Sequence, residues 1–164
     1  MKSVVKFFAV SLLAVCCMIP STLMGQTKAN FAGTWAFNEA KSTQPEGNGP
    51  RMSVQKMVVT QEANLLQLVR TSERGDMTLK YTLDGKESVN PVFGEITSKS
   101  TVAFSADGKT MTITTKMEFE REGQKTEFIT KEAWVLTSPT VLTVTNSFTT
   151  PNGEMKMTSV YDKK

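Results

Sequence analysis

The sequence predicts an all-β protein, an antiparallel up-and-down β-barrel of about ten strands. From Phe31 onward, short segments of alternating apolar and polar residues are separated by turn dipeptides at even spacing, as in barrels and sandwiches. No segment of this region has the roughly 3.6-residue apolar period of a helix. Short turns join most neighbours, and strands joined in this way pair antiparallel. The predicted strands are residues 31–38, 52–61, 65–73, 76–83, 86–92, 95–105, 109–121, 125–137, 141–150 and 154–162.

Residues 1–25 are predicted to be a signal peptide that precedes the barrel. Lys2 and Lys6 come before an apolar segment that ends at Ile19, and this segment is shorter than the roughly 20 residues that span a bilayer. Residues 23–25 form an acceptable cleavage site. Residues 26–164 are therefore expected to be one domain, exported to the periplasm or the extracellular space, with no stable membrane span.

A lipoprotein is the alternative form of export. Residues 13–16, Leu-Ala-Val-Cys, resemble a lipoprotein cleavage box, after which an acylated Cys16 or Cys17 would hold the domain on a membrane surface. The box departs from the pattern because Val15 stands where a small residue is usual. We therefore expect export without lipidation.

Composition argues against a catalytic or metal centre. The chain has no histidine, and both cysteines lie in the predicted signal peptide, so the domain lacks the commonest general base and the thiol nucleophile. Without Lys2 and Lys6, the 19 basic residues fall to 17, against 16 acidic residues. This balance leaves no basic footprint for nucleic acid. We expect no enzyme activity, no cofactor, no metal and no nucleic-acid partner.

Short loops predict the register of five hairpins. Three are two-residue turns that contain glycine, a strong hairpin signal, the fourth is an even-length loop around Arg74-Gly75, and the fifth is the three-residue loop 138–140. The two-residue turns are Asp107-Gly108, Gly123-Gln124 and Asn152-Gly153. The resulting pairs include Tyr81 with Leu68, Val102 with Ile113, Phe119 with Phe128, Trp134 with Val144 and Phe148 with Met157.

Two segments have no definite prediction. The first connection, 38–51, is long and rich in glycine and proline, and such a loop is either a mobile surface excursion or a lid over a site. Strand 86–92 has no assigned register, because Pro91 and the following Phe93-Gly94 obscure its alternation.

Combining the registers predicts a polar row across the apolar inner face of the barrel. A few polar groups in an apolar cavity are what orients a small ligand, and Glu132 would be the anchor for a cationic or hydroxylated head group. Arg70 points the same way, while Met117 and Met157 would line an adaptable apolar wall. Two alternatives remain: Glu132 pairs with Arg70 as a buried ion pair, or a bulge turns Glu132 outward. The row consists of Ser100, Thr115, Glu132, Asn146 and Ser159.

The start of the domain resembles the lipocalins and the wider calycin group of ligand-binding barrels. Gly33-Thr34-Trp35 lies on the first predicted strand, and a long loop and a series of hairpins follow. The string from Gly33 to Ser42 also resembles exported bacterial proteins described as lipocalin-like. The resemblance implies that Trp35 plugs the closed end of a barrel and that the first loop folds over its open mouth.

The sequence departs from the lipocalins in three respects. It lacks their Thr-Asp-Tyr motif, their bridging cysteines, and an arginine on the last two strands to pack on Trp35. Lys156 is the nearest cation that we expect there. Trp35 and Trp134 are expected to be core residues, since most buried aromatic side chains simply pack.

The predicted function is non-catalytic binding of a small apolar or amphipathic molecule inside an exported barrel. The alternative is a filled barrel that acts as a protein-interaction module, as an inhibitor or a subunit of a cell-surface complex. An interior with an empty volume of about 300 Å³ or more would favour the first, and dense packing the second. The ligand's identity and the oligomeric state stay open.

Overall fold

The computed structural model describes residues 27–43, 54–94, 96–121, 123–150 and 153–164. Most of the predicted first loop, as well as the predicted signal peptide with Cys16 and Cys17, lies outside these residues. The strands are β1 (Gly33–Phe37), β2 (Lys56–Gln61), β3 (Leu65–Ser72), β4 (Gly75–Thr82), β5 (Ser88–Phe93), β6 (Ile96–Phe104), β7 (Thr110–Arg121), β8 (Gln124–Ser138), β9 (Val141–Thr150) and β10 (Gly153–Lys163), with a short 3-10 helix, η1 (Glu39–Lys41), after β1.

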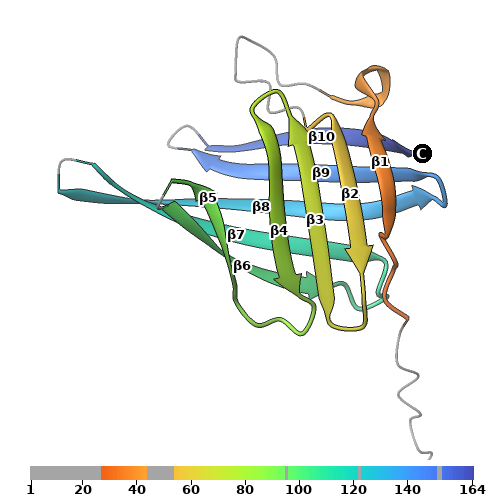
Figure 1. Cartoon of the computed structure of the whole chain (residues 1–164), viewed down its shortest axis with the longest axis horizontal. Coiled ribbons are helices and arrows are strands. Elements are labelled where there is room, and N and C mark those ends of the chain that lie inside the picture. Colours follow the sequence, from red (N-terminus) through yellow and green to blue (C-terminus); the bar gives the residue numbers. More distant parts are fainter. Residues whose placement is uncertain (1–26, 44–53, 95, 122, 151–152) are drawn as a thin grey trace, which may run out of the picture.

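The ten strands form a single antiparallel sheet in the order β4-β3-β2-β1-β10-β9-β8-β7-β6-β5. The sheet folds over on itself, so that β1 to β4 lie roughly crosswise in front of β6 to β10 (Figure 1). Consecutive strands are hydrogen-bonded neighbours except β4 and β5, which form the two edges of the sheet, and β1 joins β10. The all-β, up-and-down barrel that the sequence predicts is therefore confirmed.

Side chains bridge the two outer strands of the sheet. The Asn90 side chain on β5 accepts a hydrogen bond from the Lys80 N–H of β4 at 2.7 Å and donates one to the Lys80 carbonyl at 2.9 Å. The Ser88 hydroxyl accepts a bond from the Thr82 N–H at 2.9 Å. These bonds satisfy backbone groups of β4 that an open sheet edge would expose, so the barrel is nearly closed.

One end of the barrel is filled by large side chains and by the chain that precedes β1. Phe31, Trp35 and Trp134 are each fully buried, and the rings of Phe31 and Trp134 meet edge to face with centroids 5.9 Å apart. The indole N–H of Trp35 donates to the Phe31 carbonyl at 2.9 Å. Phe31 was predicted to begin the first strand, but it lies before β1 and packs across the closed end of the barrel.

A cation covers the ring of Trp35, although it is not the one predicted. Lys163 on β10 pairs with Trp35 in register, and its Nζ lies 5.3 Å from the centre of the indole ring. The prediction of Lys156 was wrong because β10 continues one residue beyond the expected end at 162. Gly33 leaves room for this cation, since a Cβ there would lie 2.7 Å from Lys163 Cε.

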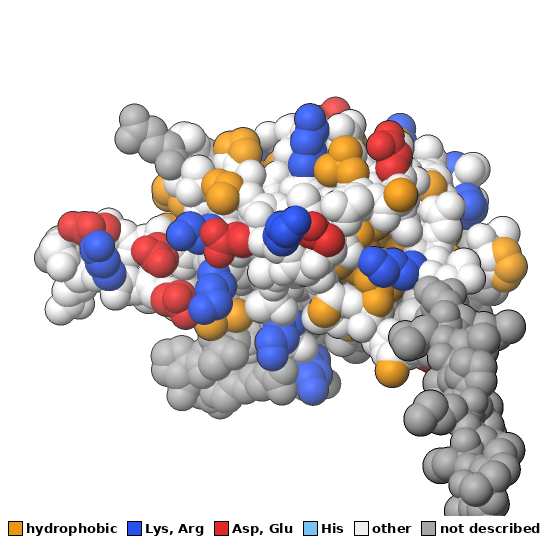
Figure 2. Space-filling view, turned by 90° about the horizontal axis from the view of Figure 1, so that it is seen from below, with side chains coloured by type: hydrophobic (Ala, Val, Ile, Leu, Met, Phe, Trp, Pro, Cys, Tyr) orange, Lys and Arg blue, Asp and Glu red, His pale blue; other side chains and the backbone are white. Residues whose placement is uncertain are grey.

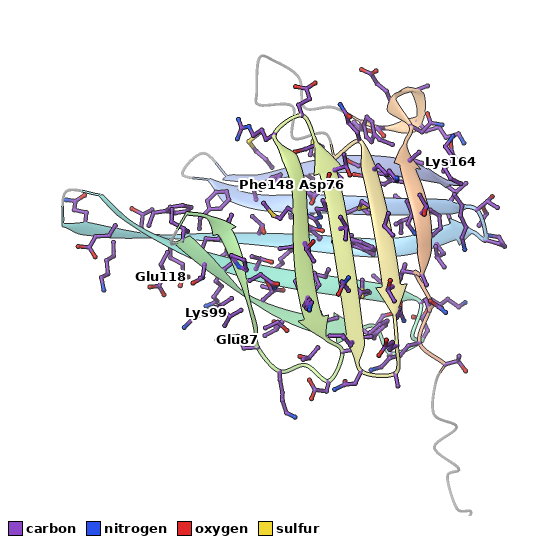
Figure 3. The ribbon with its side chains drawn as sticks, viewed as in Figure 1. Asp76, Glu87, Lys99, Glu118, Phe148 and Lys164 are labelled. Atoms are coloured by element: carbon purple, nitrogen blue, oxygen red, sulfur yellow. The ribbon has the colours of Figure 1, made fainter. Side chains whose placement is uncertain are left out.

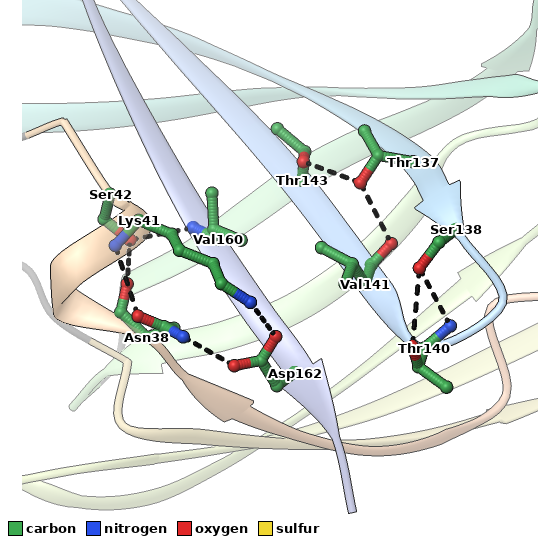
Figure 4. Close-up of polar contacts among 10 residues, drawn as sticks. All are labelled: Asn38, Lys41, Ser42, Thr137, Ser138, Thr140, Val141, Thr143, Val160 and Asp162. Atoms are coloured by element: carbon green, nitrogen blue, oxygen red, sulfur yellow. Dashed lines mark hydrogen bonds and ion pairs between the residues drawn. The ribbon is translucent and has the colours of Figure 1, made fainter.

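Hydrogen bonds tie η1 to the last strand on the outside of the barrel (Figure 4). The Asn38 side chain donates to the Asp162 carboxylate, and Lys41 makes an ion pair with it at 2.9 Å. The Ser42 hydroxyl accepts from the Val160 N–H at 2.9 Å and donates to the Asn38 carbonyl. The string that resembled the lipocalin-like proteins thus has a structural role at its end, which is to fix the start of the first connection to β10.

Two predicted registers are confirmed and three are wrong by two residues. Val102 pairs with Ile113, and Trp134 pairs with Val144, as predicted. In the other three hairpins the loop is one residue earlier than predicted. At the β3–β4 turn, for example, Ser72 pairs with Gly75, which adopts a φ of +104° that glycine tolerates best. The corrected pairs are Tyr81 with Leu66, Phe128 with Met117, and Phe148 with Met155.

A shift of two residues keeps every side chain on its predicted face, because the side chains of a strand alternate with a period of two. The predicted inner faces therefore hold, although the neighbours across the strands change. The undecided strand becomes β5, which pairs with β6 from Ser88 opposite Ser100 and loses its register between Pro91 and Phe93. The proline that obscured the alternation thus lies at the irregularity itself.

Candidate functional site

An ion pair inside the barrel joins the two crossing layers. Arg70 on β3 and Glu132 on β8 meet with Nη2 and Oε2 2.6 Å apart, and their side chains are 21% and 15% exposed. The same carboxylate oxygen accepts the indole N–H of Trp134 at 3.1 Å. Glu132 therefore points inward and pairs with Arg70. This is one of the two alternatives that the sequence analysis left open beside the role of Glu132 as a ligand anchor.

The guanidinium keeps its charge but is incompletely hydrogen-bonded. Burial is the largest single influence and disfavours the charged form of Arg70, but the charge and hydrogen bond of Glu132, together with the two nearby tyrosines, outweigh it and raise the pKa of Arg70 above its ordinary value. Its Nε is buried and has no partner. A buried donor without a partner costs about 1–3 kcal/mol, so an additional acceptor for Nε, beside Glu132, would be favourable.

Both tyrosines of the chain belong to the same cluster. Tyr81 and Tyr161 are each 4% exposed, and the charges of Arg70 and Glu132 influence the ionisation of both. Burial away from water raises the pKa of each phenol to about 12, despite the opposing effect of Arg70. At neutral pH both hydroxyls are therefore protonated and able to donate or accept hydrogen bonds.

The predicted polar row is interrupted in two places. Ser100 and Thr115 do lie opposite each other, with their hydroxyl oxygens 2.9 Å apart, and Glu132 lies opposite Asn146. Two of the predicted neighbours are wrong because of the register shifts. Thr115 pairs with Thr130 rather than Glu132, and Asn146 pairs with Met157 rather than Ser159.

The polar residues nevertheless share the inner face. Ser100 and Ser159 are buried, at 1% and 6% exposure, while Thr115 and Asn146 are half-buried. Sequence analysis missed further members, including Ser98 on β6 and the two tyrosines. Their inward positions follow from the alternation of side chains along strands that were already assigned. The signal that could have found them was therefore this alternation and not a motif. The interior is thus more polar than the predicted row.

The inner face becomes accessible toward the end of the barrel opposite Phe31. Met157 is nearly buried and Met117 is half-buried, as expected for an apolar wall. Phe128 and Phe148 stack with centroids 6.4 Å apart. Beyond them the large apolar side chains of the inner face are open to solvent, at 36% for Met77, 39% for Phe119 and 50% for Met155.

The outer face of β6, β7 and β8 is charged and of mixed sign. Acidic and basic side chains alternate along the hairpin of β7 and β8 that projects from the barrel (Figure 2). Glu87, Lys99 and Glu118 point away from the interior (Figure 3). A shallow hollow lies on this outer face and is lined by Ile96, Thr97, Lys99, Lys116 and Glu118. It contains none of the predicted ligand-binding residues.

Within the part of the chain that the structure describes, no three carboxylate or thiol side chains lie close enough together to hold a metal ion. The same part of the chain contains no helix that is long and apolar enough to cross a membrane.

Comparison with solved structures identifies the fold class. The chain is similar to zebrafish ileal bile acid-binding protein, which was crystallised with cholic acid. The two structures superpose with a TM-score of 0.52 at 15% sequence identity, over 82% of this chain and 98% of the other. No family model matches the sequence, and no curated protein matches it. At this identity the similarity establishes the calycin-like barrel and no more.

Proposed function

We propose that this protein binds a small amphipathic molecule inside its barrel, without catalysis. The observation that carries the proposal is the polar cluster of Arg70, Glu132, Tyr81 and Tyr161 inside an inner face whose apolar side chains reach solvent at one end. A ligand in that position would place its polar end at the cluster and its apolar part against Met117, Phe128 and Met157. Cholic acid, the ligand of the similar zebrafish protein, has this amphipathic character.

A neutral fluorescent probe, N-phenyl-1-naphthylamine, tests the proposal. We expect saturable uptake of about one probe per chain, because one polar cluster serves one interior. Displacement by unlabelled amphiphiles should follow. Phe148→Ala on the inner face should weaken uptake, whereas Val58→Ala, which faces outward and is 37% exposed, should leave it unchanged. Absence of saturable uptake would contradict ligand binding and favour a filled barrel that acts as a protein-interaction module.

We further propose that the barrel is exported as a soluble protein. The support is the predicted signal peptide, residues 1–25, with its basic start and apolar segment. Intact-mass analysis of the secreted form should find Gln26, or a residue near Asn30, at the N-terminus. A diacylated cysteine at the N-terminus would instead place the barrel on a membrane surface through Cys16 or Cys17.

A further inference from the structure

The charge balance of the interior distinguishes between classes of amphipathic ligand. Arg70 and Glu132 contribute one positive and one negative charge, and they are already paired at 2.6 Å. A carboxylate ligand would have to share the guanidinium of Arg70 with Glu132, or displace Glu132 from it. Two carboxylates at one partly buried cation repel each other, and the carboxylate that is displaced becomes a partly buried charge without an opposite charge beside it.

The cluster retains hydrogen-bonding capacity of both kinds. Glu132 uses Oε2 for both Arg70 and Trp134, while its Oε1 accepts no hydrogen bond from a described residue. The Glu132 side chain is 15% exposed, so it is not completely enclosed. A group that donates a hydrogen bond can therefore bind Oε1 without breaking the ion pair.

Donors to such a ligand come from the other members of the cluster. Among the described residues, Arg70 makes one side-chain hydrogen bond, through Nη2, and a guanidinium has five N–H groups. The hydroxyls of Tyr81 and Tyr161 stay protonated at neutral pH and can also donate. An uncharged group that both donates and accepts, such as an alcohol or a primary amide, satisfies both sides of the cluster at once.

We propose that the interior selects amphiphiles with an uncharged, hydrogen-bonding head group over the corresponding carboxylates. This inference rests on the proposed ligand-binding function and specifies the chemistry of the ligand. It also separates this chain from a barrel whose interior would have an unpaired arginine. In such a barrel the free guanidinium would favour the anion.

Two matched pairs of ligands test the inference at neutral pH, where the carboxylic acids are ionised. The pairs are decanol with decanoate, and cholamide with cholate, so that each pair keeps one apolar body and changes the head group. Binding is followed by displacement of the neutral probe. For the wild-type protein we expect the uncharged member of each pair to bind at least about tenfold more tightly, the scale of one hydrogen bond to a charged group.

Glu132→Gln provides the decisive variant. It keeps the shape of the side chain but removes its charge, so Arg70 becomes free to pair with an anion. The preference should fall below about threefold or reverse. Glu120→Gln, an exposed position on β7, is the matched control and should keep the wild-type preference. If the variant retained the full preference for uncharged heads, the role assigned to the ion pair would be wrong.

The wild-type measurement alone keeps the inference testable if Glu132→Gln fails to fold. Carboxylates that bind as tightly as their uncharged partners, or more tightly, would overturn the inference while ligand binding itself stands. If neither the probe nor any of the four compounds binds, the proposed function fails, and the inference fails with it. These two failures are distinguishable because the probe is neutral and does not depend on the head group.

Discussion

The two ends of the barrel use the same kinds of residue on the same face of the same strands, with opposite results. On β7, Met111 is fully buried and Phe119 is 39% exposed, while on β10, Tyr161 is 4% and Met155 is 50% exposed. All four side chains lie on the inner face. The difference comes from what covers the end, because residues 28–31 close the end that holds Trp35 and Trp134.

This comparison indicates that the two ends of the barrel contribute unequally to its stability. Fully burying one large apolar side chain contributes about 1.5–3 kcal/mol, so the closed end supplies much of the stability. The partly exposed side chains at the other end contribute less to folding and remain available for contacts with a ligand. The ion pair of Arg70 and Glu132 lies between the two regions, fixed by the indole of Trp134 on the side of the closed end.

The largest expected effect is a loss of stability from truncation at the closed end. Trp134→Ala should lower the free energy of unfolding by about 3–5 kcal/mol, as aromatic truncations in cores do. It also removes the indole N–H that binds Glu132. Urea denaturation measures the change. Lys131→Ala, an exposed position on the same strand, is the control and should shift the stability by less than about 0.5 kcal/mol.

Phe119→Ala is the comparison at the open end. Because this side chain is 39% exposed, its loss should cost clearly less than the loss of Trp134. Equal destabilisation by the two aromatic truncations would contradict the proposed difference between the ends.

The buried tyrosines predict a loss of stability at high pH. The pKa of Tyr81 and of Tyr161 is about 12 in the folded protein, against 10.0 for an exposed phenol. The unfolded chain therefore releases these protons first, and stability is unaffected below pH 10.0 but falls as the pH rises from there toward 12. The expected slope is about 1.4 kcal/mol per pH unit for each tyrosine.

Tyrosinate absorbance checks this prediction directly, because the chain has only these 2 tyrosines. Little phenolate should form in the folded protein before the unfolding transition. The double variant Tyr81→Phe with Tyr161→Phe should lose most of the alkaline slope. Phenolate formation near the ordinary pKa in the folded state would mean that water reaches the cluster freely.

A smaller effect is expected at Gly33, where the closed end meets the last strand. Its φ of +144° is unfavourable for any residue with a Cβ, and the added Cβ would also lie 2.7 Å from Lys163 Cε. Gly33→Ala should therefore destabilise the protein by about 1–3 kcal/mol. Thermal or urea denaturation measures this. Lys163→Ala separates the causes, since Gly33→Ala should remain costly in that background if the backbone conformation dominates.

The fold was predictable because its main signals are local. Alternation gave the inner face of each strand, and a two-residue error in register does not change it. For this reason Arg70 and Glu132 were assigned to the interior although Glu132 was paired with Thr115 instead of Ile113. Their direct contact across the two layers could not be derived, because it depends on how the sheet folds over itself and not on neighbouring strands.

The errors in register arise because a glycine can take several positions in a hairpin. Gly75 lies after its two-residue loop, whereas Gly123 takes the second position of its loop instead of the predicted first, and both residues adopt a positive φ. Gly108 supported the predicted register, whereas Gly75 lies after its loop. The difference in exposure along the barrel could not be predicted from the sequence either, because Met155 and Met157 are the same residue type on the same face of one strand.

The smallest expected effect is that of Met155→Ala, and its comparison with Met157→Ala contrasts the two regions most directly. Met155 and Met157 lie two residues apart on β10 and face the same side, yet they are 50% and 9% exposed. Met157→Ala should cost about 2–5 kcal/mol, the range for a buried methionine. Met155→Ala should cost less than about 0.5 kcal/mol, because water already surrounds much of its side chain. Urea denaturation of both variants measures the costs. Because both substitutions replace methionine with alanine on the same strand, side-chain chemistry and strand preference do not account for any difference between them. If Met155→Ala proved as costly as Met157→Ala, the open end would be as well packed as the closed one. The interior would then have no accessible apolar wall, and the argument for a bound amphiphile would lose its structural basis.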